Sequence, residues 1–167
     1  MIFKFSTHNN NLYNTLLTLS RNIFFYNKIK LSDSFETRIY LMFIHFSIMM
    51  IIYKKKDKKF DRKLYDKLFH SIENNLRELG FGDVSVNKKM KEFNKILYDI
   101  LLKIDLENKN QNLFKVNKTL ISRYFSELND HKNIKYLEFE TYLLDFYHFC
   151  FELPLDNMVR DAINFKN

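Results

Sequence analysis

The segment that decides the fold spans residues 35–54, which read FETRIYLMFIHFSIMMIIYK. Its middle is apolar on every side, as expected for a helix that is surrounded by other helices rather than lying on a surface. The apolar run from Ile39 to Tyr53 contains His45 and Ser47, and it is shorter than the roughly 20 apolar residues that span a bilayer. We therefore predict a buried core helix here rather than a transmembrane segment.

Apolar stripes on both sides of this segment predict the remaining helices, because side chains three and four positions apart share one helical face. The predicted helices run from Leu12 to Tyr26, Leu64 to Leu79, Met90 to Ile104, Leu113 to Leu128 and Tyr136 to Phe151, with a short terminal helix from Leu155 to Ile163. Gly80 ends the third helix, since glycine adopts the left-handed conformation that other residues resist. Residues 81–87 and 107–112 are predicted connections.

The composition favours the same fold class. The 167 residues include only 2 Gly and 1 Pro, too few for the tight turns of a many-stranded sheet. Hydrophobic residues make up 46% of the chain, which is enough for one continuous core. We therefore predict an all-α fold, a single-domain bundle of about six to seven helices over residues 1–167.

The formal charge of +7 points towards anionic partners, although the chain is also rich in Asn, Ile, Phe and Tyr, whose codons are A/T-rich like those of Lys. The densest basic run contains Lys54, Lys55, Lys56, Lys58, Lys59, Arg62 and Lys63. One interpretation is a solvated loop and helix start. The other is a patch that contacts anionic lipid or ribosomal RNA, because clustered cations gain by releasing counterions.

No pattern in the sequence indicates catalysis or metal binding. His45, His70, His131 and His148 lie on different predicted elements, and the sequence contains no His-x-x-x-His or Cys-x-x-Cys pair. The single cysteine, Cys150, is interpreted as a core thiol in a reducing compartment. We therefore predict a protein that is not an enzyme and that uses no metal or cofactor.

The most specific motif surrounds Gly80. It consists of Leu76, Arg77, Glu78, Leu79, Gly80, Phe81, Gly82 and Asp83, followed by a turn flanked by valines and a helix start that contains Lys88 and Lys89. In order and spacing it resembles the signature of the ubiquinol-cytochrome c chaperone family, whose core reads Leu-Arg-Glu-x-Gly-x-Gly-Asp.

Residues upstream extend the resemblance to about Leu12–Asp105. The positions that match the family pattern there are Arg21, Tyr26, Asp33 and Arg38. The sequence departs from the pattern at Ser32, which replaces the turn proline, and at Ile100, which stands where the family has an arginine.

The resemblance implies an assembly chaperone for the ubiquinol-cytochrome c reductase (bc1) complex of the respiratory chain. It implies a client such as cytochrome b or another bc1 subunit, contact with the ribosome or an anionic membrane surface, and a second assembly factor. The alternative functions are a basic helical module that binds ribosomes, RNA or membrane surfaces, and an enzyme acting on quinones or lipids.

The residues 1–20 contain too many asparagines for a signal peptide, and they lack an Arg-rich presequence. We therefore expect a bacterial cytoplasmic protein at the inner membrane, with the mitochondrial matrix as the alternative.

A purely structural interpretation of the motif is also open. Gly80 and Gly82 would shape a helix–turn–helix, Asp83 would cap the next helix, and Arg77 would pair with Asp83 across the turn.

Overall fold

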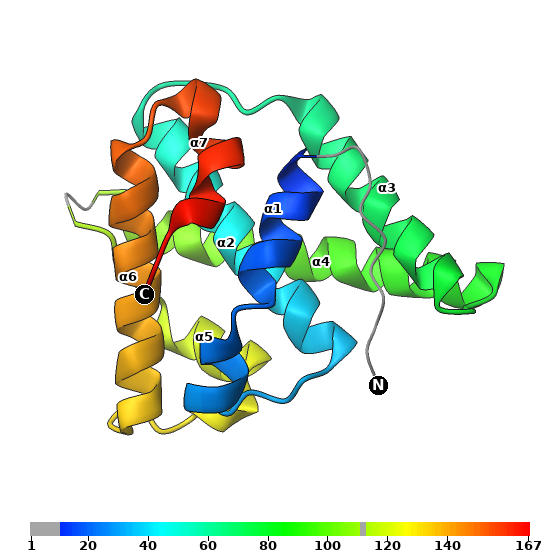
Figure 1. Cartoon of the computed structure of the whole chain (residues 1–167), viewed down its shortest axis with the longest axis horizontal. Coiled ribbons are helices and arrows are strands. Elements are labelled where there is room, and N and C mark those ends of the chain that lie inside the picture. The colour runs from blue at the N-terminus through cyan, green and yellow to red at the C-terminus, as the bar shows by residue number, and fades with distance from the viewer. Residues whose placement is uncertain (1–10, 111–112) are drawn as a thin grey trace.

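The computed structural model describes residues 11–110 and 113–167, and within these ranges it contains helices and no strand. The all-α prediction is confirmed. The seven α-helices are α1 (Asn11–Ser20), α2 (Phe35–Lys55), α3 (Arg62–Glu78), α4 (Asp83–Asn108), α5 (Lys118–Tyr124), α6 (Ile134–Glu152) and α7 (Leu155–Asp161). In Figure 1, α6 stands along one side of the bundle, α2 crosses the middle, and the α3–α4 hairpin extends to the opposite side.

The helix α2 forms the centre of the bundle. It contacts α1, α4, α6 and α7, and nearly all of its side chains from Leu41 to Ile52 are buried. By length and composition it is able to cross a membrane, but 78% of its most apolar window is buried inside the protein. Ser34 is the N-terminal cap of the helix, because its hydroxyl oxygen accepts a bond of 3.1 Å from the backbone N–H of Thr37. The prediction of a buried core helix is confirmed.

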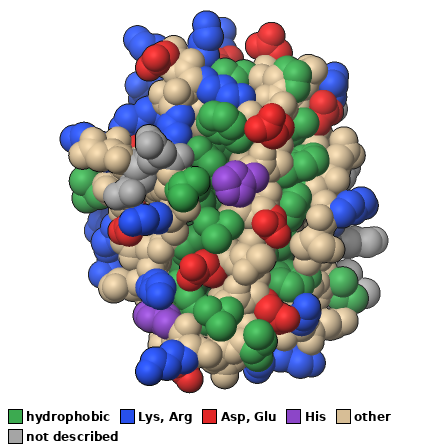
Figure 2. Space-filling view, turned by 90° about the vertical axis from the view of Figure 1, so that its left-hand side faces the viewer, with side chains coloured by type: hydrophobic (Ala, Val, Ile, Leu, Met, Phe, Trp, Pro, Cys, Tyr) green, Lys and Arg blue, Asp and Glu red, His purple; other side chains and the backbone are tan. Residues whose placement is uncertain are grey.

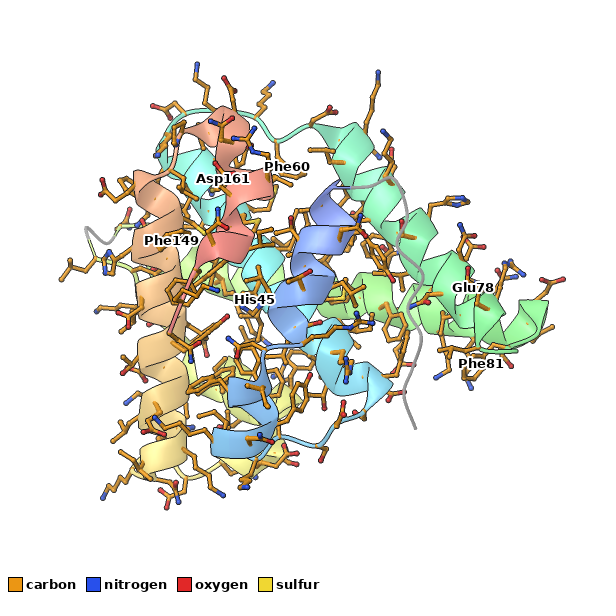
Figure 3. All side chains as sticks on the ribbon, in the orientation of Figure 1. His45, Phe60, Glu78, Phe81, Phe149 and Asp161 are labelled. Atoms are coloured by element: carbon orange, nitrogen blue, oxygen red, sulfur yellow. The ribbon has the colours of Figure 1, made fainter. Side chains whose placement is uncertain are left out.

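His45 lies on α2 at the middle of the bundle (Figure 3) and is fully buried. Its Nδ1 lies 2.6 Å from the Leu41 carbonyl oxygen, which only accepts, so Nδ1 carries the proton. Nε2 therefore accepts a bond of 2.8 Å from the Tyr142 hydroxyl on α6. Burial lowers the pKa of His45 to about 4, against the opposing effect of the Leu41 carbonyl. The imidazole is thus a neutral hydrogen-bonded link between two helices.

Three predicted boundaries are wrong. The first helix ends at Ser20 instead of Tyr26, and a separate π-helical turn follows at Phe24–Lys28. The cause is local: the Asn22 side chain accepts from the Phe24 N–H at 3.0 Å, and the Tyr26 hydroxyl donates to the Ser20 carbonyl at 2.7 Å. These bonds replace the helical ones that would continue α1.

The other two errors concern α4 and α5. The helix α4 begins at Asp83, so the connection from α3 is much shorter than residues 81–87. The helix α5 is confined to Lys118–Tyr124, because Asn108 binds both backbone groups of Lys115 and holds that segment extended. Asn117 then accepts from the Leu120 N–H at 2.9 Å and begins α5 as its cap.

Candidate functional site

The glycine-containing motif forms the tight turn between α3 and α4. Gly80 has φ +95°, and the backbone N–H groups of Gly80 and Phe81 bond to the carbonyl oxygens of Arg77 and Leu76 at 3.0 and 3.2 Å. This is the arrangement of a Schellman motif, in which glycine occupies the left-handed position. Leu76 is fully buried and anchors the turn to the core. The predicted left-handed glycine is confirmed.

Charged side chains tie the two helices together across this turn. Arg77 bonds to the Asp83 carboxylate and, at 3.0 Å, to that of Glu73. The predicted Arg77–Asp83 pair is therefore confirmed. The predicted capping role of Asp83 is wrong, because Gly82 is the cap residue of α4 and Asp83 is its first helical residue. Glu78 is exposed at the outer end of the hairpin, as Figure 3 shows.

The upstream family positions form a second cluster between α1 and α2. The Arg38 guanidinium bonds to Asp33 through Nε and Nη2, at 3.0 and 2.7 Å, and lies 5.4 Å from the centre of the Tyr26 ring. Burial raises the pKa of Tyr26 to about 12, against the opposing effect of Arg38. Arg21 closes the end of α1, where its N–H bonds to the carbonyl groups of Leu17 and Thr18. This cluster fixes the path from α1 into α2.

Lys89 connects the two clusters, and Lys88 does not. The Lys89 ammonium lies 3.7 Å from Glu36 in the first turn of α2 and 5.1 Å from the centre of the Phe81 ring. Lys88 is exposed on the outer side of α4. The structure therefore links the α3–α4 turn to the first turn of α2 through Lys89.

The two departures from the family pattern also have structural partners. The N–H and hydroxyl groups of Ser32 bond to Glu127 at 3.0 and 2.7 Å, and a proline would lack that N–H. Ile100 is buried in the core. The preceding Asp99 bonds to Lys103, Arg123 and Tyr124, which joins α4 to α5.

The basic run divides into two halves. Lys54 pairs with Asp105 at 2.5 Å, Lys55 lies 5.4 Å from the centre of the Tyr147 ring, and Lys56 donates to the Phe151 carbonyl at 2.6 Å. These three lysines hold the end of α2 against α4 and α6, and Lys56 also meets the negative end of the α6 dipole. The second half is exposed and consists of Lys58, Lys59, Arg62 and Lys63.

A groove lies beside this basic run, between the second half of α2 and the C-terminal half of α4. Its volume is about 590 Å³, and its lining is mostly apolar. The lining residues are Met50, Ile51, Tyr53, Lys54, Lys58, Lys59, Phe60, Tyr98, Leu101, Leu102 and Asp105. Figure 3 shows Phe60 at the end of the molecule where the chain passes from α2 to α3.

An exposed apolar ridge on α4 forms one wall of the groove and continues beyond it. We call Tyr98, Leu102 and Leu106 the α4 ridge; they are 61%, 57% and 61% exposed. Their spacing of four residues places them on one face of the helix. Sequence reasoning missed this ridge, although the spacing is visible in the sequence, because only the buried stripe of α4 was considered.

A second exposed apolar surface lies on α6, where Ile134 and Leu137 are 64% and 45% exposed. The hollow beside them includes the acidic residues Glu138 and Asp145 and also Lys28, which pairs with Glu138 at 3.0 Å. Figure 2 views the side of the molecule on which α6 lies, and hydrophobic side chains are interspersed there with acidic ones. Basic side chains gather along the top and the left edge of the same view. The hollow on α6 is therefore of mixed charge, whereas the described lining of the α2–α4 groove has three lysines and one carboxylate.

The remaining candidate residues form no reactive arrangement. Cys150 is buried, and burial raises the pKa of its thiol to about 12, which keeps it protonated at neutral pH. His148 is exposed on another side of α6. Among residues 11–110 and 113–167, no three His, Cys, Asp or Glu side chains gather where they would hold a metal. The arrangement offers an apolar binding surface with a cationic edge.

Comparison with protein families gives one result. The model of the ubiquinol-cytochrome C chaperone family matches residues 27–130, a segment that includes the α3–α4 turn, the basic run and the groove. No curated protein and no solved structure matches the chain.

Proposed function

We propose that the client of this protein is cytochrome b. The premise is that the chain belongs to the ubiquinol-cytochrome C chaperone family, whose members have a general role in assembly of the bc1 complex. The proposed binding site is the groove between α2 and α4 together with the α4 ridge. Membership in a chaperone family also suggests a binding function rather than catalysis.

The observation that carries this proposal is the apolar character of the groove and its open ridge. Contiguous exposed apolar patches on soluble proteins often mark interaction sites. Tyr98, Leu102 and Leu106 repeat at helical spacing, which suits an apolar helix laid along α4. A membrane subunit awaiting assembly presents such helices. Covering apolar surface stabilises the complex by about 25 cal/mol per Å² before the costs of association.

The rigidity of the bundle supports the same proposal. The floor of the groove includes Met50 and Ile51 of the central helix, and Ile51 is 5% exposed. Phe60 packs edge to face against Phe46 and Tyr53, at ring-centre distances of 5.3 and 5.2 Å. The groove is therefore formed before any client arrives, which lowers the entropy lost on binding.

Site-specific crosslinking tests the proposal. A photoreactive amino acid replaces Leu102 in cells that are assembling their bc1 complex, and the crosslinked protein is identified by mass spectrometry. We expect a crosslink to cytochrome b. The matched control carries the same amino acid at Leu137, an exposed leucine on α6. Equal crosslinking from both positions would show that the groove is not the site, and a product with another bc1 subunit would replace cytochrome b as the client.

A further inference from the structure

We propose that a hollow between α2, α4 and α6 is a headgroup site for anionic phospholipid, through which the protein docks on a bilayer. The hollow has a volume of about 440 Å³. Its lining residues are Ile51, Lys54, Lys55, Asp105, Asn108, Lys109, Tyr147 and Phe151. It adjoins the α2–α4 groove, because Ile51, Lys54 and Asp105 line both.

The charge of the hollow suits a phosphate group. Lys54, Lys55 and Lys109 contribute three ammonium groups, and Asp105 is the only carboxylate among the described lining residues. That carboxylate is already paired with Lys54 at 2.5 Å. The Asn108 amide is held by the backbone, since it donates to the carbonyl groups of Ile104 and Lys115. With three lysines against one carboxylate, the lining carries a net positive charge, which suits an anionic group.

The surroundings of the hollow extend the cationic surface. Lys58 and Lys59 are exposed and line the adjoining groove. Lysines thus line both the hollow and the groove, a distribution that suits a negatively charged plane. Each lysine near an anionic membrane contributes about 1 kcal/mol, which corresponds to roughly fivefold in partitioning.

The α4 ridge favours a bilayer over RNA. Leu102 and Leu106 are more than half exposed beside these lysines, and leucine side chains gain by entering the boundary between headgroups and acyl chains. Single-stranded RNA is bound mainly by aromatic stacking and cations, and aliphatic side chains add little. Docking by this face turns the groove towards the lipid, where an apolar membrane segment would be available.

Cosedimentation with vesicles tests the proposal. The probes are vesicles of phosphatidylcholine with and without phosphatidylglycerol, and polyuridylate as the RNA. We expect binding only to the vesicles that contain phosphatidylglycerol, with weaker binding at high salt. Lys55→Gln with Lys109→Gln should weaken this binding by about 30-fold, from two lysines at the value given above. Leu102→Ser with Leu106→Ser should also weaken it.

The control is Lys88→Gln with Lys91→Gln, which neutralises two exposed lysines at the other end of α4. It should leave vesicle binding within about twofold of the wild-type value, because these lysines lie outside the docking face. Equal losses in both lysine pairs, or equal binding to uncharged vesicles, would overturn the headgroup site. Stronger binding to polyuridylate that survives the leucine changes would overturn it in favour of RNA. The vesicles contain no client, so these results are independent of the crosslinking experiment, and melting temperatures verify that each variant is folded.

Discussion

The two ends of α4 serve different purposes. Near Asp83 the helix is locked into the bundle by a Schellman turn, by Arg77 and by the buried Leu76. Some 15 residues further on, about 22 Å along the axis, it presents the α4 ridge to the surroundings. Figure 3 shows Phe81 at the outer end of the hairpin and Phe60, which lines the groove, in a different part of the molecule. The most recognisable motif therefore marks a structural support, and the candidate binding surface lies elsewhere on the same helix.

The sharpest way to test this comparison is to shorten one leucine at each end. Leu76→Ala should lower the free energy of unfolding by about 2–5 kcal/mol, because it leaves a cavity beneath the turn. Leu102→Ala should change it by less than about 0.5 kcal/mol, since the side chain is 57% exposed. Urea denaturation measures both values. A large loss of stability for Leu102→Ala would show that the ridge is part of the core.

Acidification should lower the free energy of unfolding, because the core that supports both ends of α4 contains the buried His45. The pKa of His45 is about 4 in the folded protein and about 6.5 when unfolded, so the unfolded chain binds more protons between these values. Stability is therefore greatest above pH 6.5 and is lost as the pH falls through this window. From about pH 7 to about pH 5 the loss should be on the order of 2 kcal/mol from this group. Urea denaturation at both pH values measures it.

The control for this effect is His45→Leu, which removes the titrating group while keeping an apolar side chain. The variant should be less stable at neutral pH, because the Tyr142 hydroxyl loses its acceptor. The difference in its stability between about pH 7 and about pH 5 should be smaller than that of the wild type by about 2 kcal/mol. An unchanged difference would assign the pH dependence to other groups.

Much of the structure around the α3–α4 turn was predictable from the sequence, because the interactions there are local. Gly80 ends a helix, and Arg77 and Asp83 lie six positions apart across the turn. The division of the basic run was not predictable, because the partners of Lys55 and Lys56 come from α6, about 95 residues away. The sequence does indicate which stripe of α4 is buried, with Phe93 and Ile100 on it as predicted, but it does not show that the second apolar stripe stays exposed. Leu97 and Leu102 are equally apolar, and only packing against α2 buries Leu97 completely.

Substituting the two glycines of the turn should affect stability less than the changes above, and unequally. Gly80→Ala should cost about 1 kcal/mol, because φ +95° is unfavourable for a residue with a β-carbon although nothing lies within 4 Å of it. Gly82→Ala should stay within about 0.5 kcal/mol of the wild-type stability, since its φ of −73° is ordinary and its surroundings are equally open. Equal costs at both positions would contradict a role for the left-handed turn.

The smallest effect is expected for Asp83→Ala, and it bears most directly on the purpose of the motif. Asp83 is largely exposed, and exposed ion pairs contribute little to stability, so the melting temperature should fall less than for Gly80→Ala. Crosslinking from Leu102 should be unchanged, because the turn supports α4 without touching the client. An unchanged melting temperature combined with lost crosslinking would reverse the comparison. The motif would then contact the client, and both ends of α4 would belong to one extended binding surface.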